Sequence, residues 1–145
     1  MLVLASQSPR RQELLRNAGI EFVVQAADVI EDLLPNEAPD AYVRRLAREK
    51  ALAVWQHRAN VRQLAGGELV LGADTTVIVD HHILAKPVDA EDAKRMLRLL
   101  SDRTHEVMTG VCLLGEGFDD VRMESTHVTF AALNESALET YVASG

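Results

Sequence analysis

The chain has 145 residues and a formal net charge of -7, and this acidic balance argues against a general nucleic-acid-binding protein. The single cysteine, Cys112, excludes a framework of internal disulfides, and no apolar run approaches the ~20 residues of a membrane span. Residues 1–6 lack the basic and apolar pattern of a signal peptide. We therefore predict one cytoplasmic domain over residues 1–145, with neither a nucleic acid nor a membrane as its partner.

The first elements expected along the chain are a strand, a helix and a second strand. Residues 2–5 are apolar and typical of a short buried strand. Ser8 can cap a helix whose first residue is Pro9. The apolar stripe that would bind this helix to the core comprises Leu14, Leu15 and Ala18. Residues 20–25 predict another strand, and the acidic residues 26–38 predict an irregular loop.

A second helix begins at Pro39 and leads to the central strands. Its apolar residues recur at helical spacing, and we expect them in the core: Val43, Leu46, Ala47, Ala51 and Val54. A buried strand at residues 69–71 runs up to Asp74. Extended chain continues over residues 75–79, and the turn at residues 80–82 predicts a hairpin.

The last third of the chain repeats this mixture of helices and strands. A helix over residues 89–100 has Asp89 as its expected N-cap. Residues 107–114 and 121–131 alternate as strands do, with a glycine-rich turn between them, and Asn134 can cap a final helix. Strands and helices mixed in this order predict an α/β fold.

The segment Ser-Gln-Ser-Pro-Arg-Arg at residues 6–11 lies where a strand turns into a helix. Arg10 and Arg11 add charge to a helix N-terminus that is already partly positive because its first N–H groups are unpaired. An anion would compensate this charge, and the hydroxyls of Ser6 and Ser8 could join the arginines in holding a phosphate. Solvated surface arginines explain the segment equally well, and it lacks the glycines of a P-loop.

Four further charged residues are candidates for the same site, although each has an ordinary explanation when taken singly. Asp74 follows an apolar strand, where ligands collect in α/β folds, but it could simply form a turn. Lys50 and Lys86 could be solvated surface charges. Glu31, in the acidic loop, could bind Mg²⁺ or face solvent.

Taken together and in order, these segments form a specific pattern. They are Leu-Ala-Ser-Gln-Ser-Pro-Arg-Arg at residues 4–11, Arg-Leu-Ala-Arg-Glu-Lys-Ala at residues 45–51, Leu-Gly-Ala-Asp-Thr at residues 71–75, and Lys-Pro at residues 86–87. This set resembles the Maf family of nucleotide pyrophosphatases. The segment His-Glu-Val-Met-Thr-Gly-Val at residues 105–111 is similar to the family as well, so the resemblance covers essentially the whole chain.

The resemblance implies an α/β fold in which a mixed, twisted sheet is flanked by helices around a central cleft, similar to the inosine-triphosphate pyrophosphatases. It implies hydrolysis of a nucleoside triphosphate to the monophosphate and pyrophosphate with a divalent metal, Mg²⁺ or Mn²⁺. The sequence Gly-Ala-Asp-Thr at residues 72–75 resembles the subgroup that acts on dTTP and UTP. The family is also associated with inhibition of septum formation, and a homodimer is an expected assembly.

Roles for single residues follow from the same resemblance. Asp74 would be the general base that activates water, and it would bind metal together with Glu31. Phosphate would be held by Ser6, Arg10, Arg11, Lys50 and Lys86. Arg10 and Thr75 would bear on the choice of base. These groups match what attack on an α-phosphorus needs, namely an activated water and cations for the developing charge.

The chain departs from the family at its end. Residues 141–145 lie just before the family's Glu-Pro-x-Asp-Lys-Ala-Gly-x-Tyr segment, so we expect the chain to be C-terminally truncated relative to the family, with an incomplete site. Two alternatives therefore stay open. One is a catalytically impaired nucleotide-binding regulator of cell division or septum formation, and the other is an α/β domain whose motif residues are relics.

Overall fold

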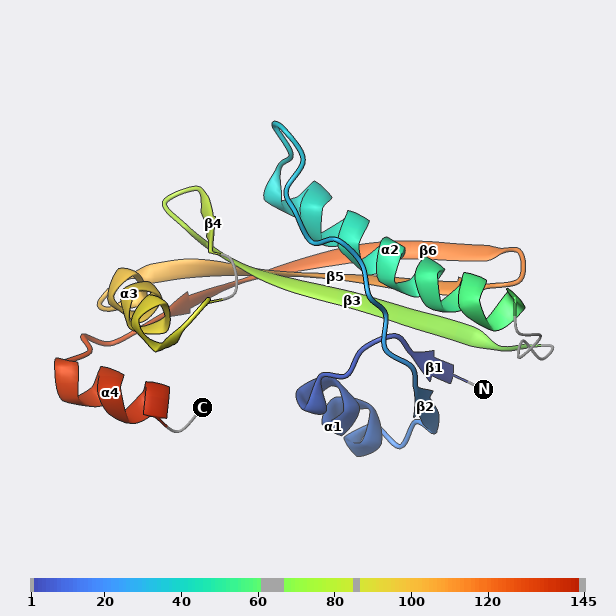
Figure 1. Ribbon diagram of the computed structural model, residues 1–145, viewed down its shortest axis with the longest axis horizontal. Coiled ribbons are helices and arrows are strands. Elements are labelled where there is room, and N and C mark those ends of the chain that lie inside the picture. Colours follow the sequence, from blue (N-terminus) through green and yellow to red (C-terminus); the bar gives the residue numbers. More distant parts are fainter. Residues whose placement is uncertain (1, 61–66, 85–86, 144–145) are drawn as a thin grey trace. The chain divides into compact units, whose positions relative to one another are not determined.

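Six strands form one mixed sheet in the computed structural model, which describes residues 2–60, 67–84 and 87–143 (Figure 1). The strand order is β2-β1-β3-β5-β6, and β4 pairs with β3. β1 is parallel to both β2 and β3, whereas β4 is antiparallel to β3. The strand bounds are β1 (Leu2–Leu4), β2 (Phe22–Val24), β3 (Leu69–Val79), β4 (His82–Leu84), β5 (Thr104–Gly115) and β6 (Phe118–Thr129).

Four helices accompany these strands in the described part of the chain: α1 (Pro9–Asn17), α2 (Pro39–Asn60), α3 (Ala90–Leu100) and α4 (Glu135–Ala143). The predicted α/β fold with a mixed sheet and flanking helices is confirmed, and the central cleft stays a prediction. The order of the elements also agrees with the sequence. Among the described residues, no helix has both the length and the apolar character needed to cross a membrane.

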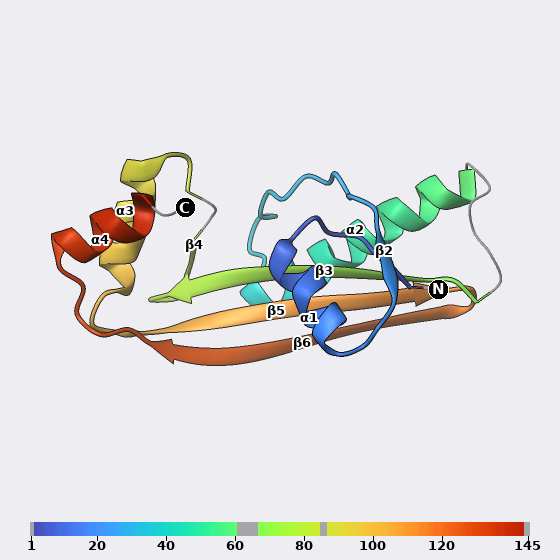
Figure 2. The same cartoon turned by 90° about the horizontal axis from the view of Figure 1, so that it is seen from below.

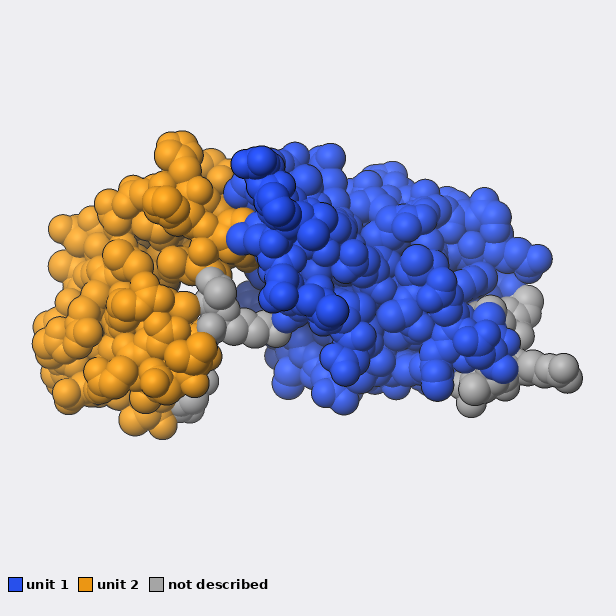
Figure 3. Space-filling view, turned by 45° about the horizontal axis from the view of Figure 1, so that its top comes forward, with its two compact units in different colours: residues 1–75, 109–124 blue, residues 76–108, 125–145 orange. Residues whose placement is uncertain are grey.

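The chain divides into two compact units, which Figure 3 shows in different colours. Unit 1 comprises residues 1–75 and 109–124 and contains β1, β2, α1 and α2. Unit 2 comprises residues 76–108 and 125–145 and contains β4, α3 and α4. The strands β3, β5 and β6 contribute residues to both units. The prediction of a single domain over the whole chain stays a prediction.

The core of unit 1 lies under α2. All of the apolar residues expected on the inner face of this helix are buried. Three of them join residues of the sheet region in one cluster made up of Val3, Ala5, Ala47, Ala51, Val54, Val70, Cys112 and Leu114. Cys112 is fully buried in β5, and burial together with the nearby charge of Asp119 raises the pKa of its thiol to about 11. Its thiol is therefore chemically inert at neutral pH.

Two glycines let the backbone of α2 approach the sheet closely. A β-carbon at Gly72 in β3 would lie 2.7 Å from the backbone nitrogen of Ala51 and closer still to the carbonyl oxygen of Ala47. A β-carbon at Gly110 in β5 would meet the carbonyl group of Val43. Only glycine fits at these two contacts, so α2 is held directly against β3 and β5.

The N-terminal helix α1 is capped as predicted but is not packed as predicted. The Ser8 hydroxyl accepts a hydrogen bond from the backbone N–H of Arg11, and Pro9 is the first helical residue. However, α1, which is described throughout, has no buried residue, and Leu14 is 59% exposed. The expected apolar stripe of Leu14, Leu15 and Ala18 is therefore wrong as a core contact. The adjacent strands are only three residues long and offer little apolar surface to cover.

Unit 2 is built on two capped helices that pack against each other, α3 and α4 (Figures 1 and 2). Asp89 accepts a hydrogen bond from the N–H of Asp92 at 2.7 Å, and Asn134 accepts one from the N–H of Ala137 at 2.7 Å. Both caps were predicted from the sequence. The β3–β4 hairpin is also confirmed, and the strands β5 and β6 are longer than predicted.

Candidate functional site

The predicted site residues of unit 1 gather beyond the carboxyl end of β1. This strand pairs with β3 up to Leu71, whose carbonyl accepts from the N–H of Ala5 at 2.8 Å. β3 then continues through Asp74 to Val79, so the prediction that Asp74 lies just past its strand is wrong. The β-branched residues after Asp74 extend the strand. Asp74 nevertheless lies past the end of the shorter parallel strand β1, at the kind of sheet edge where ligands collect.

A first cluster joins the start of α1 to β3. The Arg11 guanidinium donates from Nη1 to the Ser6 hydroxyl at 3.3 Å and from Nη2 to the Thr75 hydroxyl at 3.2 Å. Ser6 also accepts from the backbone N–H of Ser8 at 3.2 Å. The serines of the 6–11 segment thus organise the helix start, and Arg11 reaches from there to the central strand.

Arg10 stands apart from this cluster. It is exposed and forms no hydrogen bond or ion pair with another described residue. Its guanidinium is therefore available to an anion. The structure brings together Ser6, Arg11 and Thr75 but does not join Arg10 to them. Lys86, the remaining phosphate-binding candidate, lies outside the described residues.

A second cluster has Lys50 at its centre. The Lys50 ammonium lies 2.9 Å from a carboxylate oxygen of Asp74 and 2.9 Å from one of Glu31. The side chains of Lys50 and Asp74 are 13% and 10% exposed, while that of Glu31 is 35% exposed. Residues from the acidic loop, α2 and β3 therefore meet at one point. The same three residues were named from the sequence as candidates for one site.

The two clusters share one electrostatic environment. Burial lowers the pKa of Arg11, and the negative charges of Asp74 and Glu31 oppose that effect. Burial raises the pKa of Tyr42, and the same two carboxylates raise it further. The carboxylates are thus close enough to act on groups of both α1 and α2, and the cations of Arg11 and Lys50 flank them.

Two residues of this region were not identified from the sequence as site residues. The hydroxyl of Thr109 in β5 lies 3.1 Å from that of Thr75, which extends the first cluster to a second strand. The Tyr42 hydroxyl donates to the backbone carbonyl of Glu31. Thr109 belongs to a segment that resembles the family, but nothing in its residue type marked it. Tyr42 carries no sequence signal beyond its position on the helix.

The residues present fit a divalent cation. Glu31 and Asp74 already hold a cation between them, in the form of the Lys50 ammonium. Mg²⁺ is commonly held by one or two carboxylates together with substrate oxygens. No group of three or more His, Cys, Asp or Glu residues that could hold a metal occurs in the described ranges, so the protein alone would supply few ligands. Such a site suits a metal that arrives with a phosphate substrate.

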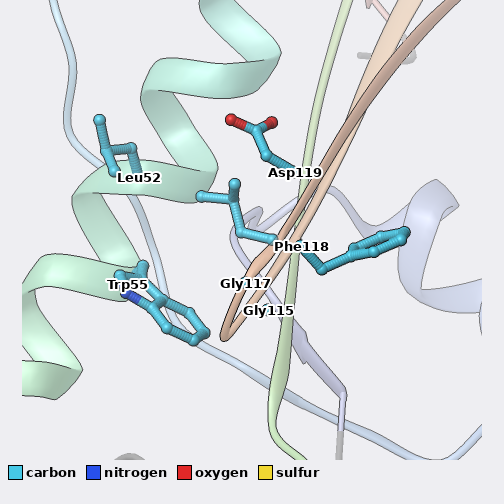
Figure 4. Close-up of a pocket in the computed structure, with 7 residues that line it drawn as sticks. Leu52, Trp55, Gly115, Gly117, Phe118 and Asp119 are labelled. Carbon is cyan, nitrogen blue, oxygen red and sulfur yellow. The ribbon is translucent and has the colours of Figure 1, made fainter.

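A separate apolar pocket of about 320 Å³ lies where α2 meets the turn between β5 and β6 (Figure 4). Leu52 and Trp55 line it from the helix, and the ring of Phe118 points away from them. Asp119 at its rim is already paired with Arg48 at 2.9 Å. Because the pocket offers no cation for a phosphate and none of the predicted site residues lines it, it is not part of the charged site.

Comparison with known proteins identifies relatives over the whole chain. The family model described as "Maf-like protein" matches residues 1–145. The chain is 46% identical over 144 residues to the dTTP/UTP pyrophosphatase of Koribacter versatilis (strain Ellin345), covering 99% of this chain and 71% of that one. It is 49% identical over 150 residues to the dTTP/UTP pyrophosphatase of Anaeromyxobacter dehalogenans (strain 2CP-C), with 99% and 71% coverage.

Among solved structures, the chain is similar to the Ham1 protein of Staphylococcus aureus, with a TM-score of 0.49 and 14% identity. The match covers 87% of this chain and 69% of that one.

Proposed function

This chain belongs to the Maf family, and from that premise we propose that it hydrolyses dTTP and UTP to the nucleoside monophosphate and pyrophosphate. The relatives that it resembles at 46% and 49% identity are named for that activity. The observation that carries the proposal is the buried meeting point of Lys50 with Asp74 and Glu31 beside Arg11. We propose that this candidate base and these two cations act on one phosphate group.

Asp74 is the proposed general base. Its carboxylate lies in a largely buried position, 2.9 Å from the Lys50 ammonium. A carboxylate there can take the proton of a water that attacks the α-phosphorus, while Lys50 balances the charge that develops on the phosphate oxygens. Because water itself forms the new bond to phosphorus and pyrophosphate leaves with the electrons of the broken P–O bond, no covalent intermediate on the protein is required.

The N-terminal turn of α1 is the proposed binding site for the polyphosphate. Arg11 and the Ser6 hydroxyl converge there, and the exposed Arg10 is free to bind an anion from solution. Lys86 is proposed to bind phosphate on the strength of the family motif alone. Arg10 and Thr75 are the proposed determinants of base choice on the strength of the family resemblance, and the Thr75 hydroxyl accepts a hydrogen bond from Arg11.

A divalent metal, Mg²⁺ or Mn²⁺, is the proposed cofactor. Glu31 and Asp74 would hold it, and it would supply Lewis-acid stabilisation to the phosphate oxygens. We further propose that the enzyme works in the cytoplasm as a single domain, with a homodimer as its expected assembly. Removal of divalent ions with a chelator should abolish turnover, and re-addition of Mg²⁺ or Mn²⁺ should restore it.

A nucleotide panel tests the proposal. The chain is incubated with dTTP, UTP, dCTP, ATP or GTP in the presence of Mg²⁺, and pyrophosphate and monophosphate are measured. We expect equal amounts of the two products, with dTTP and UTP turned over fastest. Release of inorganic phosphate in place of pyrophosphate would refute the reaction. Tight nucleotide binding without any product would favour the alternative of a regulator that has lost catalysis.

A further inference from the structure

The acidic loop that carries Glu31 is irregular, yet it is bound tightly to α2 through Arg45. The guanidinium donates from Nε to one carboxylate oxygen of Glu37 at 2.7 Å and from Nη2 to the other at 2.9 Å. Nη2 also donates to the backbone carbonyl of Asp32 at 2.9 Å. The Arg45 side chain of α2 therefore holds the acidic loop at two points, at Asp32 directly after Glu31 and at Glu37 near the end of the loop.

Arg45 is itself fixed on the helix. Its Nη1 donates to Glu49, one turn further on, at 3.2 Å, and its guanidinium lies 5.6 Å from the centre of the Tyr42 ring. The Glu37 side chain is only 8% exposed. The hydrogen bonds from Arg45 are the main reason why the pKa of Glu37 is lowered. A two-pronged, largely buried pair of this kind is stronger than an ordinary surface ion pair.

The loop closes on itself around this contact. The N–H of Leu34 donates to the Glu37 carboxylate at 3.2 Å, and the N–H of Glu37 donates to the carbonyl of Leu34 at 3.1 Å. At the other end, the Tyr42 hydroxyl binds the carbonyl of Glu31. The backbone of the loop is thus fixed on both sides of Asp32, and the Glu31 side chain is directed to Lys50.

We propose that Arg45 is a positioning residue that holds Glu31 beside Lys50 and Asp74 by clamping the loop at Glu37 and at the carbonyl of Asp32. The inference rests on the proposed function of Glu31 and Asp74 but concerns a residue that touches neither. It assigns a role to the first arginine of the segment at residues 45–51, of which catalysis otherwise uses only Lys50. Glu37 is the partner on which the clamp depends.

Arg48 provides a matched control on the same helix. Its side chain is 48% exposed, and its guanidinium pairs with Asp119 of β6 rather than with the loop. Removing it deletes an arginine and an ion pair of α2 without touching the clamp. Arg45→Lys keeps the charge but cannot form the two-pronged pair, and Glu37→Gln keeps the size of the partner but removes its charge.

The test measures amide hydrogen exchange and steady-state kinetics with dTTP in the same set of variants. In Arg45→Ala, Arg45→Lys and Glu37→Gln, the amides of Leu34 and Glu37 should exchange at least ~10-fold faster than in the unsubstituted chain. The kcat for pyrophosphate release should fall ~10- to 100-fold, because displacing a site residue by about 1 Å can cost that much. The KM should change less than about threefold, since Arg10 and Arg11 are unaffected. Arg48→Ala should change neither quantity.

Two results would overturn the inference: unchanged exchange of the loop amides in all three clamp variants, or faster exchange with an unchanged kcat. If Arg45→Ala does not fold, Glu37→Gln decides, because it keeps the side-chain volume. If the unsubstituted chain releases no pyrophosphate, the proposed function fails, while the exchange rates still decide whether Arg45 holds the loop.

Discussion

Arg11 connects the parts of the site at the level of single residues. It starts from the first turn of α1, donates to Ser6 and to Thr75, and lies within the field of Asp74 and Glu31. Because its planar guanidinium is held by two hydroxyls, its orientation is set before a ligand arrives. A group oriented in this way loses less conformational freedom on binding than a free surface arginine would.

Thr75→Val tests this arrangement. The substitution keeps the branched shape of the side chain but removes the hydroxyl that accepts from Arg11 and contacts Thr109. We expect the KM for dTTP to rise about 5- to 10-fold, which corresponds to about 1–1.4 kcal/mol, the net contribution of a typical hydrogen bond. We also expect the preference for dTTP and UTP over other nucleotides to weaken.

Thr129→Val is the matched control, because it removes a hydroxyl from the Thr104–Thr129 pair of β5 and β6, which the proposed reaction does not use. An unchanged KM in Thr75→Val, or an equal change in Thr129→Val, would contradict the role of Thr75.

The sequence predicted some of these residues and not others, for a physical reason. Two arginines at a helix N-terminus violate the usual charge preference, so Arg10 and Arg11 were recognisable as candidates for anion binding. Thr109 became part of the site only because β5 lies beside β3 in the sheet, and strand order is not encoded in local residue patterns. The role of Arg45 likewise depends on where the irregular loop folds back.

At the scale of elements, α2 and β3 form the base of the site. Lys50 on the helix and Asp74 on the strand meet because the two backbones touch at Gly72. A helix held that close fixes the height of Lys50 above the sheet. The contact is thus a structural requirement of the charged site as well as of the core.

Gly72→Ala tests that requirement. The new methyl group would collide with the backbone of α2 at Ala47 and Ala51, so the helix must move away from the strand. We expect the free energy of unfolding to fall by about 1–3 kcal/mol, the usual cost of overpacking a core, and pyrophosphate release to fall with it. Chemical denaturation and the dTTP assay measure the two effects.

Gly115→Ala is the control for the added methyl group. At that position the nearest atom is the end of the Leu69 side chain, which can rotate away. Equal losses of stability in the two variants would contradict the claim that backbone contact at Gly72 matters.

Element boundaries show where sequence reasoning succeeds. The periodicity of α2 and the caps at Ser8, Asp89 and Asn134 were predicted correctly, because caps and periodicity are local. The burial of Leu14 was predicted wrongly, because it depends on how much sheet the helix finds to cover. The break expected at Asp74 was wrong, since Asp74 resembles a turn residue although it lies inside β3, and the extended chain predicted for residues 75–79 belongs to the same strand.

At the scale of the whole molecule, His105 makes the free energy of unfolding depend on pH. It lies in β5 of unit 2, is 5% exposed, and packs edge-on against Phe130 at 4.9 Å. Its Nδ1 has no hydrogen-bond partner within the described part of the chain. Burial lowers the pKa of this histidine, so the folded protein favours the neutral ring.

The sign of the effect on stability follows by linkage. As the pH falls, the histidine of the unfolded chain binds a proton at about pH 6.5, at a higher pH than that of the folded protein. The contribution of His105 to the free energy of unfolding is therefore fully present above that pH. It is lost as the pH falls below about 6.5, with a slope of at most about 1.4 kcal/mol per pH unit from this one group. Urea unfolding between pH 5 and pH 8 measures it.

His105→Phe keeps an aromatic ring and removes the titration, so the variant should lose less stability than the unsubstituted chain on acidification. His127→Gln, which alters an exposed histidine of the same unit, should leave the acid sensitivity in place. Identical pH dependence of the His105→Phe variant and the unsubstituted chain would contradict the assignment.

Asp74 is proposed to activate the water that cleaves dTTP. This proposal is tested most directly by measuring pyrophosphate release and dTTP binding for Asp74→Asn beside the unsubstituted chain, with Asp119→Asn as a control for loss of a carboxylate elsewhere. We predict that Asp74→Asn still binds dTTP but releases pyrophosphate at least ~100-fold more slowly, in the range typical for loss of a general base, while Asp119→Asn is unaffected. Near-normal turnover by Asp74→Asn would contradict the account.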